Sequence, residues 1–263
     1  MPESAPDTSP TQNDPVDLTG QVALVTGATS GLGWRFASVL AAAGASVVAT
    51  GRRKERLDEL CAQIEETGGT AVGVPMDVTD AAQVVAAVDA AEAAFGLVTI
   101  LVNNAGIPDA ARAHKMPLEL VDAVLDTNLR GPWLMATEVG RRLIAAEQPG
   151  RIVNISSIGG FHYQGGGAAL YSVTKAALTR VTEVLAVEWS RNRINVNGIA
   201  PGSFESEMMA GMIERVGDFT SMLPRKRLGT ASQLDSTLLY LVSPASEAVT
   251  GTIVKVDDGQ GGR

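Results

Sequence analysis

Short apolar runs alternate with longer, helix-like stretches along almost the whole chain. The runs, in order, are VALVT, SVVAT, AVGVP, TILVN, RIVNIS, INVNGI and TIVKV. Unbroken apolar runs of this kind are typical of strands that are buried on both faces. Strands that alternate with helices are typical of a parallel sheet whose two faces are both covered by helices. The pattern therefore predicts an α/β fold with a doubly wound parallel sheet in a single domain.

The first sixteen residues differ from the rest of the chain. The segment MPESAPDTSPTQNDPV is rich in proline and polar side chains and contains no apolar run able to act as a signal-peptide core. It predicts a disordered N-terminal tail at 1–16 and a folded domain at 17–263. No later apolar run approaches the roughly twenty residues of a membrane helix, so a soluble protein without a membrane partner is expected.

Glycines gather directly after the first predicted strand. Val22–Val25 is followed by the turn TGATSGLG and by the helical pattern FASVLAAAGA. A glycine turn between a strand and a helix lets the backbone approach a pyrophosphate, whose charge is attracted by the free amides at the helix start. An ordinary strand-to-helix connection is the alternative. The predicted cofactor contacts of this turn are Thr26, Gly27, Ser30, Gly31, Leu32 and Gly33, with Thr26 and Ser30 as hydroxyl donors.

Tyr171 and Lys175 form a candidate catalytic pair. They lie four residues apart in the helix-like run ALYSVTKAAL, so both side chains leave the same face of the helix. An ammonium beside a phenol favours the phenolate and lowers the phenol pKa from about 10, which suits acid or base catalysis. A chance pair on a solvated helix face is the alternative. Tyr163 is a weaker candidate because Gly167 stands where its lysine would be.

The glycine turn and the YxxxK pair together resemble the short-chain dehydrogenase/reductase family. Further matches follow in order between Leu18 and Gly259, in TILVNNAG, DTNLRG, RIVNISS and IAPG. The resemblance implies a Rossmann-like sheet and an oxidoreductase that transfers a hydride between a nicotinamide cofactor and a ketone or secondary alcohol. It also implies cofactor contacts at Asp77, Val78, Asn104, Ala105, Gly106, Tyr171, Lys175, Pro201, Gly202 and Ser206.

The same resemblance implies four catalytic residues, which are Asn128, Ser157, Tyr171 and Lys175. In this assignment Tyr171 gives a proton to a ketone oxygen or takes one from an alcohol. Lys175 lowers the pKa of the phenol and holds the ribose hydroxyls. Ser157 hydrogen-bonds the substrate oxygen, and Asn128 supports a water-linked proton path.

Three of the assigned residues also have structural interpretations. Ser157 fits a capped strand end, Asn128 fits a helix kink, and Asp77 fits a turn acid. The helix after Asp77 is expected to begin near Asp80, with Thr79 as its cap.

The end of the second predicted strand bears on the choice of cofactor. NAD-binding folds tend to place an acid there against the ribose 2'-hydroxyl, and NADP-binding folds an arginine. This chain has Gly51 in the acid's place, followed by Arg52 and Arg53 at a helix start, where the dipole disfavours cations. A bound 2'-phosphate explains these arginines and favours NADP over NAD, while two solvated arginines are the alternative.

Composition removes several classes of partner. The formal net charge of −8 and the pI near 4.9 argue against a nucleic-acid partner or an anionic membrane surface, because both require a basic face. Cys61 is the single cysteine, and His114 and His162 are the only histidines. These counts exclude an intramolecular disulfide, predict no metal site, and fit a reducing cytoplasm.

The segment 203–227, which we call the lid, is expected to cover the substrate. It carries Phe204, Met208, Met209, Met212 and Phe219, an adaptable apolar set that suits a bulky or hydrophobic ketone. An amphipathic helix packed on the body or on a neighbouring subunit is the alternative. Two further functions remain open: a 3-oxoacyl-[acyl-carrier-protein] reductase, and a regulatory protein that binds the dinucleotide without turnover.

Two long helical stretches carry more apolar surface than one sheet face needs. They lie around Leu120–Ala146 and Ala176–Trp189. Packing such helices across two-fold axes would bury these faces. Together with the family resemblance, this predicts a homotetramer.

Overall fold

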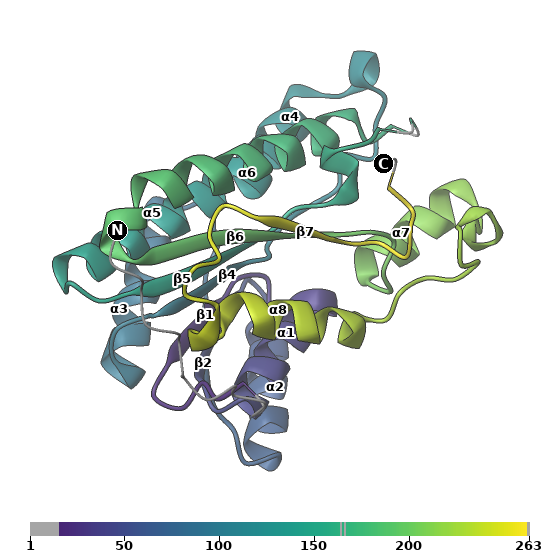
Figure 1. Ribbon diagram of the computed structural model, residues 1–263. Coiled ribbons are helices and arrows are strands. Elements are labelled where there is room, and N and C mark those ends of the chain that lie inside the picture. The colour runs from purple at the N-terminus through teal and green to yellow at the C-terminus, as the bar shows by residue number, and fades with distance from the viewer. Residues whose placement is uncertain (1–15, 164, 166, 262–263) are drawn as a thin grey trace, which may run out of the picture.

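The computed structural model describes residues 16–163, 165 and 167–261, so nearly all of the predicted tail lies outside the described part of the chain. Its centre is a seven-stranded, fully parallel sheet in the order β3-β2-β1-β4-β5-β6-β7 (Figure 1). The strands are β1 (Val22–Val25), β2 (Ser46–Gly51), β3 (Thr70–Pro75), β4 (Ile100–Asn103), β5 (Gly150–Ile155), β6 (Ile194–Pro201) and β7 (Ile253–Val256). Each coincides with one of the predicted apolar runs.

Helices cover both faces of the sheet, as the alternating pattern predicts (Figure 1). Apolar side chains of α1, α2 and α8 form one core cluster, and those of α3, α5 and α6 form the other. The helices are α1 (Gly31–Ala42), α2 (Lys54–Glu66), α3 (Ala81–Phe95), α4 (Leu118–Leu125), α5 (Gly131–Ala145), α6 (Ala169–Glu188), α7 (Glu207–Val216) and α8 (Asp235–Val242). The doubly wound, single-domain architecture is therefore confirmed.

Residues of one strand point alternately into these two clusters. In β1, Ala23 and Val25 belong to the cluster with α1, whereas Val22 and Leu24 belong to the cluster with α3 and α5. Every second residue of a strand faces the same side, so a strand covered on both faces needs apolar side chains at every position. This explains why the strands appear in the sequence as unbroken apolar runs.

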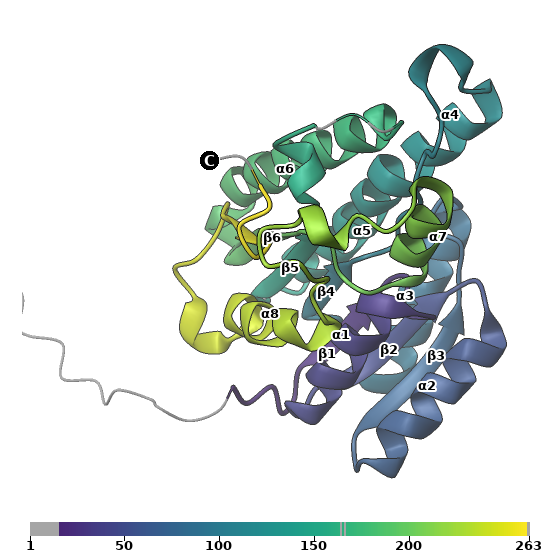
Figure 2. The ribbon, with the colours of Figure 1, turned by 90° about the vertical axis from the view of Figure 1, so that its right-hand side faces the viewer.

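The direction of strand succession reverses between β1 and β4. The chain leaves β1 toward β2 and β3 on one side, and later continues from β4 through β5, β6 and β7 on the other. Ligands of doubly wound sheets bind in the crevice at the carboxyl ends of the strands at such a point. The glycine turn follows β1 and the NNAG sequence follows β4, so both lie at this crevice. Figure 2 views the molecule from the side on which α7 lies.

Two details of the helices differ from the prediction, although α3 begins near Asp80 as expected. The side chain of Asp80, not that of Thr79, caps α3 by accepting hydrogen bonds from the amides of Ala82 and Gln83. The stretch predicted as one helix from about 120 to 146 is α4 and α5 joined by a π-helical turn, Asp126–Arg130.

Two absences apply to the described residues alone. None of the helices there is both long and apolar enough to cross a membrane. No cluster of histidine, cysteine, aspartate or glutamate side chains there could hold a metal ion.

Candidate active site

The glycine turn after β1 approaches its neighbours too closely for side chains. Gly27 and Gly31 have φ angles of 65° and 52°, a region that favours glycine. A Cβ atom on Gly27 would lie 2.8 Å from the Cα of Ala105, and one on Gly33 would lie 2.3 Å from the Gly27 carbonyl oxygen. The glycines therefore let the turn, the start of α1 and the NNAG segment pack backbone against backbone.

Thr26 joins this turn to the NNAG segment. Its buried hydroxyl accepts hydrogen bonds from the amides of Asn104 (3.0 Å) and Ala105 (3.1 Å). The side-chain amide of Asn104 donates back to the carbonyls of Thr26 (3.0 Å) and Gly27 (3.1 Å). The Thr26 hydroxyl also donates to the Val102 carbonyl at 3.4 Å, so in this structure it is turned toward the protein, and its role as a phosphate donor stays a prediction.

The start of α1 fits an anionic group. Ser30 is the N-cap residue but makes no capping hydrogen bond, and the first turn of the helix contains no acidic side chain. The first amides of a helix lack intrahelical partners, and the helix dipole adds partial positive charge there. This turn can therefore hold the pyrophosphate of a dinucleotide. Leu32, the remaining predicted contact, is half-buried and packs against the core cluster that contains α1.

The end of β2 lacks the acid that would bind a ribose 2'-hydroxyl. A Cβ atom on Gly51 would lie 2.6 Å from Cγ2 of Thr29, so this position has no room for a side chain without rearrangement. The side chain of Arg52 is 73% exposed, with Nη1 4.0 Å from Oδ2 of Asp77. Arg53 turns instead toward Thr29, whose hydroxyl lies 2.9 Å from Nη2.

Asp77 and Val78, in the loop after β3, both make contacts within the protein. Oδ1 of Asp77 accepts hydrogen bonds from both the amide (3.0 Å) and the hydroxyl (2.8 Å) of Thr79. This is the geometry of a turn acid, and its second oxygen faces Arg52. Val78 is buried against Gly131, where an added Cβ atom would lie 2.9 Å from Cγ2 of the valine.

Tyr171 and Lys175 lie on the first turns of α6, but their pKa values differ from the simple expectation. Nζ of Lys175 donates a 2.8 Å hydrogen bond to the Ile155 carbonyl at the end of β5 and lies 5.6 Å from the centre of the Tyr171 ring. Burial lowers the pKa of Lys175 to about 8. Burial also raises the pKa of the Tyr171 phenol, a hydrogen bond with Ser157 opposes that rise, and the charge of Asp109 adds to it. The expected fall in the phenol pKa is therefore wrong for this structure.

Ser157 lies beside the phenol at the end of β5. Its hydroxyl accepts the Gly159 amide at 3.1 Å and so caps a short 3-10 turn, Ile158–Gly160. A Cβ atom on Gly159 would lie 3.3 Å from Oγ of Ser157 and 3.9 Å from Cε1 of Tyr171. Both side chains therefore lie against this glycine. The rival phenol, Tyr163, is 49% exposed.

Asn128 is fully buried inside the π-helical turn. Its Oδ1 accepts the Ile107 amide at 2.8 Å, and its Nδ2 donates to the Ile107 carbonyl at 2.9 Å. A Cβ atom on Gly106 would lie 3.3 Å from Oδ1 of Asn128 and 3.5 Å from Nζ of Lys175. The structure therefore places Asn128 and the lysine against the same glycine and, as the alternative interpretation expected, Asn128 at a helix irregularity.

Asp109 is a site residue that the sequence prediction missed. It is 0% exposed, and its Oδ2 accepts the amides of Leu170 (2.8 Å) and Tyr171 (3.0 Å) at the start of α6. Its Oδ1 is buried without a hydrogen-bond partner among the described residues. An acid in a loop carries no sequence signal for such a role, because its partners lie about sixty residues away.

The loop after β6 brings the lid to the glycine turn. The amide of Gly202 bonds to the Val256 carbonyl, which fixes the end of β6 and Pro201. Ser206 caps α7 and lies against Gly31, whose added Cβ atom would be 3.3 Å from the serine Cβ.

The apolar side chains of the lid differ in exposure. Met208 and Met212 are exposed, and α7 has no buried residue. Phe204 does not belong to that surface, because it is 6% exposed and packs into the core against Gly229.

Comparisons with known proteins agree with this geometry. A family model described as enoyl-(acyl carrier protein) reductase matches residues 27–260. The gluconate 5-dehydrogenase of Gluconobacter oxydans is 36% identical, over 94% of this chain and 96% of that protein. The 3-oxoacyl-[acyl-carrier-protein] reductase of Thermotoga maritima is 34% identical, over 92% of this chain and 98% of that protein.

Solved structures agree as well. An actinorhodin polyketide ketoreductase variant with NADPH has a TM-score of 0.89 at 33% identity, covering 92% of this chain and 98% of the other. A short-chain type dehydrogenase/reductase from Mycobacterium marinum has a TM-score of 0.89 at 32% identity, covering 93% and 96%. These matches span nearly the whole folded chain and include the segments that carry the site. The protein belongs to the short-chain dehydrogenase/reductase family of NAD(P)-dependent oxidoreductases.

Proposed function

We propose that this protein interconverts a ketone and a secondary alcohol with NADP(H), with Tyr171 as the acid or base. The observation that carries the proposal is the convergence of Tyr171, Ser157 and Lys175 beside a glycine turn that fits a dinucleotide. A bound nicotinamide supplies or accepts the hydride in such chemistry. The protein's own residues must then hold the substrate oxygen and move its proton.

Each side chain has a task that follows from its position. Ser157 and Tyr171 are adjacent, so both hydroxyls can hydrogen-bond one substrate oxygen and stabilise charge that develops on it. In ketone reduction the phenol gives its proton to that oxygen, and in alcohol oxidation the phenolate takes it back. The Lys175 ammonium has three donors, of which the Ile155 carbonyl accepts one, so it can also hold ribose hydroxyls.

The proton path and the remaining cofactor contacts belong to the proposal too. Asn128 holds the Ile107 backbone beside Lys175, where it can support a water-linked path to solvent. The segments that contribute backbone or side-chain contacts to the dinucleotide are the ends of β1, β3, β4 and β6, with Ser206 at the start of the lid.

The residues at the end of β2 support a preference for NADP over NAD. Gly51 leaves no acid for a 2'-hydroxyl, and the exposed Arg52 offers a guanidinium that can bind a 2'-phosphate. We expect NADPH to bind about tenfold to a hundredfold more tightly than NADH at low salt. Titration of the wild-type protein with both cofactors checks this, and equal affinities would mean that Arg52 is merely solvated.

A bulky or apolar substrate is supported by the lid. The helix α7 exposes Met208 and Met212 and buries none of its residues, so its apolar side chains are available to a ligand. The relatives include enzymes named for gluconate, a polyhydroxy acid, and threitol, a polyol, and such polar substrates would leave this apolar surface unused.

A 3-oxoacyl-[acyl-carrier-protein] reductase is the second candidate, since several relatives carry that name and an acyl chain would also suit the methionines. Against it stands the net charge of −8, because an acidic carrier needs a basic docking surface. A regulatory protein without turnover is the least supported alternative, because no member of the catalytic set is missing from the chain.

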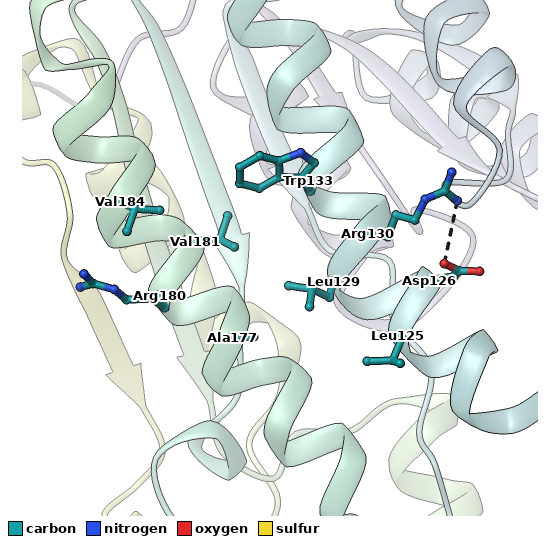
Figure 3. A pocket seen from close by; sticks show the side chains of 9 residues that line it. All are labelled: Leu125, Asp126, Leu129, Arg130, Trp133, Ala177, Arg180, Val181 and Val184. Atoms are coloured by element: carbon teal, nitrogen blue, oxygen red, sulfur yellow. Dashed lines mark ion pairs between the residues drawn. The ribbon is translucent and has the colours of Figure 1, made fainter. Parts of the chain in front are cut away.

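We propose that the face formed by α5 and α6 is an interface between copies of this chain. Figure 3 shows an apolar groove with Leu125, Leu129 and Trp133 on one side and Val181 and Val184 on the other. Its rim carries both signs of charge, in the Asp126–Arg130 pair and in Arg180. A second copy related by a two-fold axis can bury such a face against itself and pair these charges, which supports the expected homotetramer. We place the protein in the cytoplasm, which its unpaired Cys61 suits.

Replacement of the tyrosine tests the proposed function. Tyr171→Phe is expected to lower turnover by about 10²- to 10⁴-fold while NADPH affinity, measured by fluorescence titration, stays within about threefold. Tyr163→Phe is the matched control and should retain activity. The assay uses a panel of bulky ketones, 3-oxoacyl thioesters and secondary alcohols. Retention of more than about a third of turnover by Tyr171→Phe, with chemistry rate-limiting, would remove the proton-donor assignment.

A further inference from the structure

The lid is fastened to the glycine turn by one carboxylate. Oε1 of Glu207 lies 3.1 Å from Nη1 of Arg53, and Oε2 lies 3.1 Å from Nη2 of the same guanidinium. Oε2 also accepts a 3.0 Å hydrogen bond from the hydroxyl of Ser30. Glu207 is the first residue of α7, so this contact joins the start of the lid to the glycine turn, which is expected to hold the pyrophosphate, and to Arg53, which is expected to bind the 2'-phosphate.

The partners of Glu207 are the groups that an anionic phosphate would use. A guanidinium binds carboxylate and phosphate with the same two-pronged geometry, and a serine hydroxyl is a donor to both. Arg53 is held in place from behind by the Thr29 hydroxyl, at 3.2 Å from Nε and 2.9 Å from Nη2. The hydrogen bond with Arg53 lowers the pKa of Glu207, so this carboxylate is ionised at neutral pH.

We propose that Glu207 is a cofactor-specificity residue, whose carboxylate competes with the 2'-phosphate of NADP for Arg53 and Ser30. The inference rests on the proposed function, because it presumes a nicotinamide dinucleotide in the glycine turn. With NADPH the phosphate must displace Glu207 or share its guanidinium, and like charges close together repel each other. With NADH, which has no phosphate, the contact between lid and turn is kept. Glu207 therefore makes the preference for NADPH over NADH smaller than Arg52 and Arg53 would produce in its absence.

Binding of two small ligands that differ only in the phosphate isolates this effect. Adenosine 2',5'-bisphosphate and 5'-AMP are titrated calorimetrically at low salt into wild type and Glu207→Gln, and NADPH and NADH are titrated by fluorescence. We expect Glu207→Gln to tighten the bisphosphate and NADPH by about 3- to 10-fold, with 5'-AMP and NADH changed by less than about twofold. Glu214→Gln, an exposed acid on the same helix, is the matched control and should change none of the affinities.

A second arm tests the route through the guanidinium. In an Arg53→Ala background, the Glu207→Gln effect on the bisphosphate should disappear, since the two residues act as one unit. An undiminished effect in that background would overturn the proposed competition. Weaker binding of 5'-AMP or NADH by Glu207→Gln would also overturn it, because Glu207 would then be a ligand of the ribose hydroxyls. Failure of the proposed function looks different: the wild-type protein would bind neither nicotinamide dinucleotide.

Discussion

Lys175 is 4% exposed, and its ammonium is hydrogen-bonded to the carbonyl of Ile155. A carbonyl compensates a buried positive charge less well than a carboxylate does, and burial accordingly lowers the lysine pKa to about 8. Such a residue costs stability in the free protein. Its position beside Tyr171 and Gly106 suits a charge that is used in binding and catalysis. The buried ammonium therefore lowers the stability of the free protein while it serves the proposed activity.

We expect Lys175→Met to stabilise the free protein at pH 7 by roughly 1–3 kcal/mol while abolishing turnover. Below about pH 8 the folded protein carries the full cost of the buried ammonium. Between about pH 8 and 10.5 the folded lysine loses its proton while the unfolded chain keeps it, so wild-type stability rises and the advantage of the variant shrinks. Urea unfolding at pH 7 and pH 10 measures both effects. A variant that is less stable than wild type at pH 7 would contradict this account of Lys175.

Residue roles were predictable where a short motif fixes the local geometry and not where the partner is distant. The glycines of the turn and the Tyr171–Lys175 spacing are visible in the sequence because neighbours on one helix or turn decide them. The hydroxyl of Thr26 looks like a phosphate donor in sequence, and only the docking of β4 beside β1 turns it inward. Arg53 likewise appears solvated until the lid brings Glu207 to it.

At the scale of elements, α6 depends on another part of the chain for its first turn. The residue before the helix, Ala168, has no side chain that can cap it. Asp109, in the loop after β4, accepts the amides of Leu170 and Tyr171 in its place. A carboxylate at a helix start also interacts favourably with the helix dipole. The same contact fixes the backbone of Tyr171, so we regard Asp109 as a positioning residue.

We expect Asp109→Ala to destabilise the protein by about 1–3 kcal/mol, because two partly buried amides lose their acceptor. The variant should also lower kcat more than it raises KM, since the phenol moves while the remaining substrate contacts persist. Asp109→Asn keeps an acceptor oxygen and should recover most of both losses. Thermal unfolding and steady-state kinetics of the two variants check this, and an asparagine variant as impaired as the alanine variant would show that the charge, not the cap, is essential.

Element positions were predicted closely because burial on both sides of the sheet leaves a strong apolar signal. The capping residue of α3 was predicted wrongly, since Thr79 and Asp80 are both good caps by type. Asp77 decides between them by taking the Thr79 hydroxyl, which leaves Asp80 to accept the helix amides. The π-helical turn at Asp126–Arg130 interrupts a stretch that was predicted as one helix, although a helix kink at Asn128 was one of the interpretations of the sequence.

At the scale of the whole molecule, the apolar groove on α5 and α6 should be covered in solution. Sedimentation at micromolar concentration is expected to give a homotetramer for the wild type. Val184→Glu places a charge inside the groove and should shift the protein toward smaller species, while Val85→Glu, a change at an exposed valine on α3, should not. A wild-type protein that sediments as a monomer would contradict the proposed assembly.

The bond between Thr26 and the NNAG segment also has a consequence for the order in which the chain acquires structure. The glycine turn lies near the start of the chain, yet its partners Asn104 and Ala105 lie 78 and 79 residues further on. A nascent chain that ends before β4 can pair β1 with β2, but it has neither these amides nor the strand on the other side of β1. The glycine turn, although it is synthesised early, can therefore complete its cofactor site only after β4 has been made. Until then, free cofactor in the cell cannot stabilise the turn by binding to it.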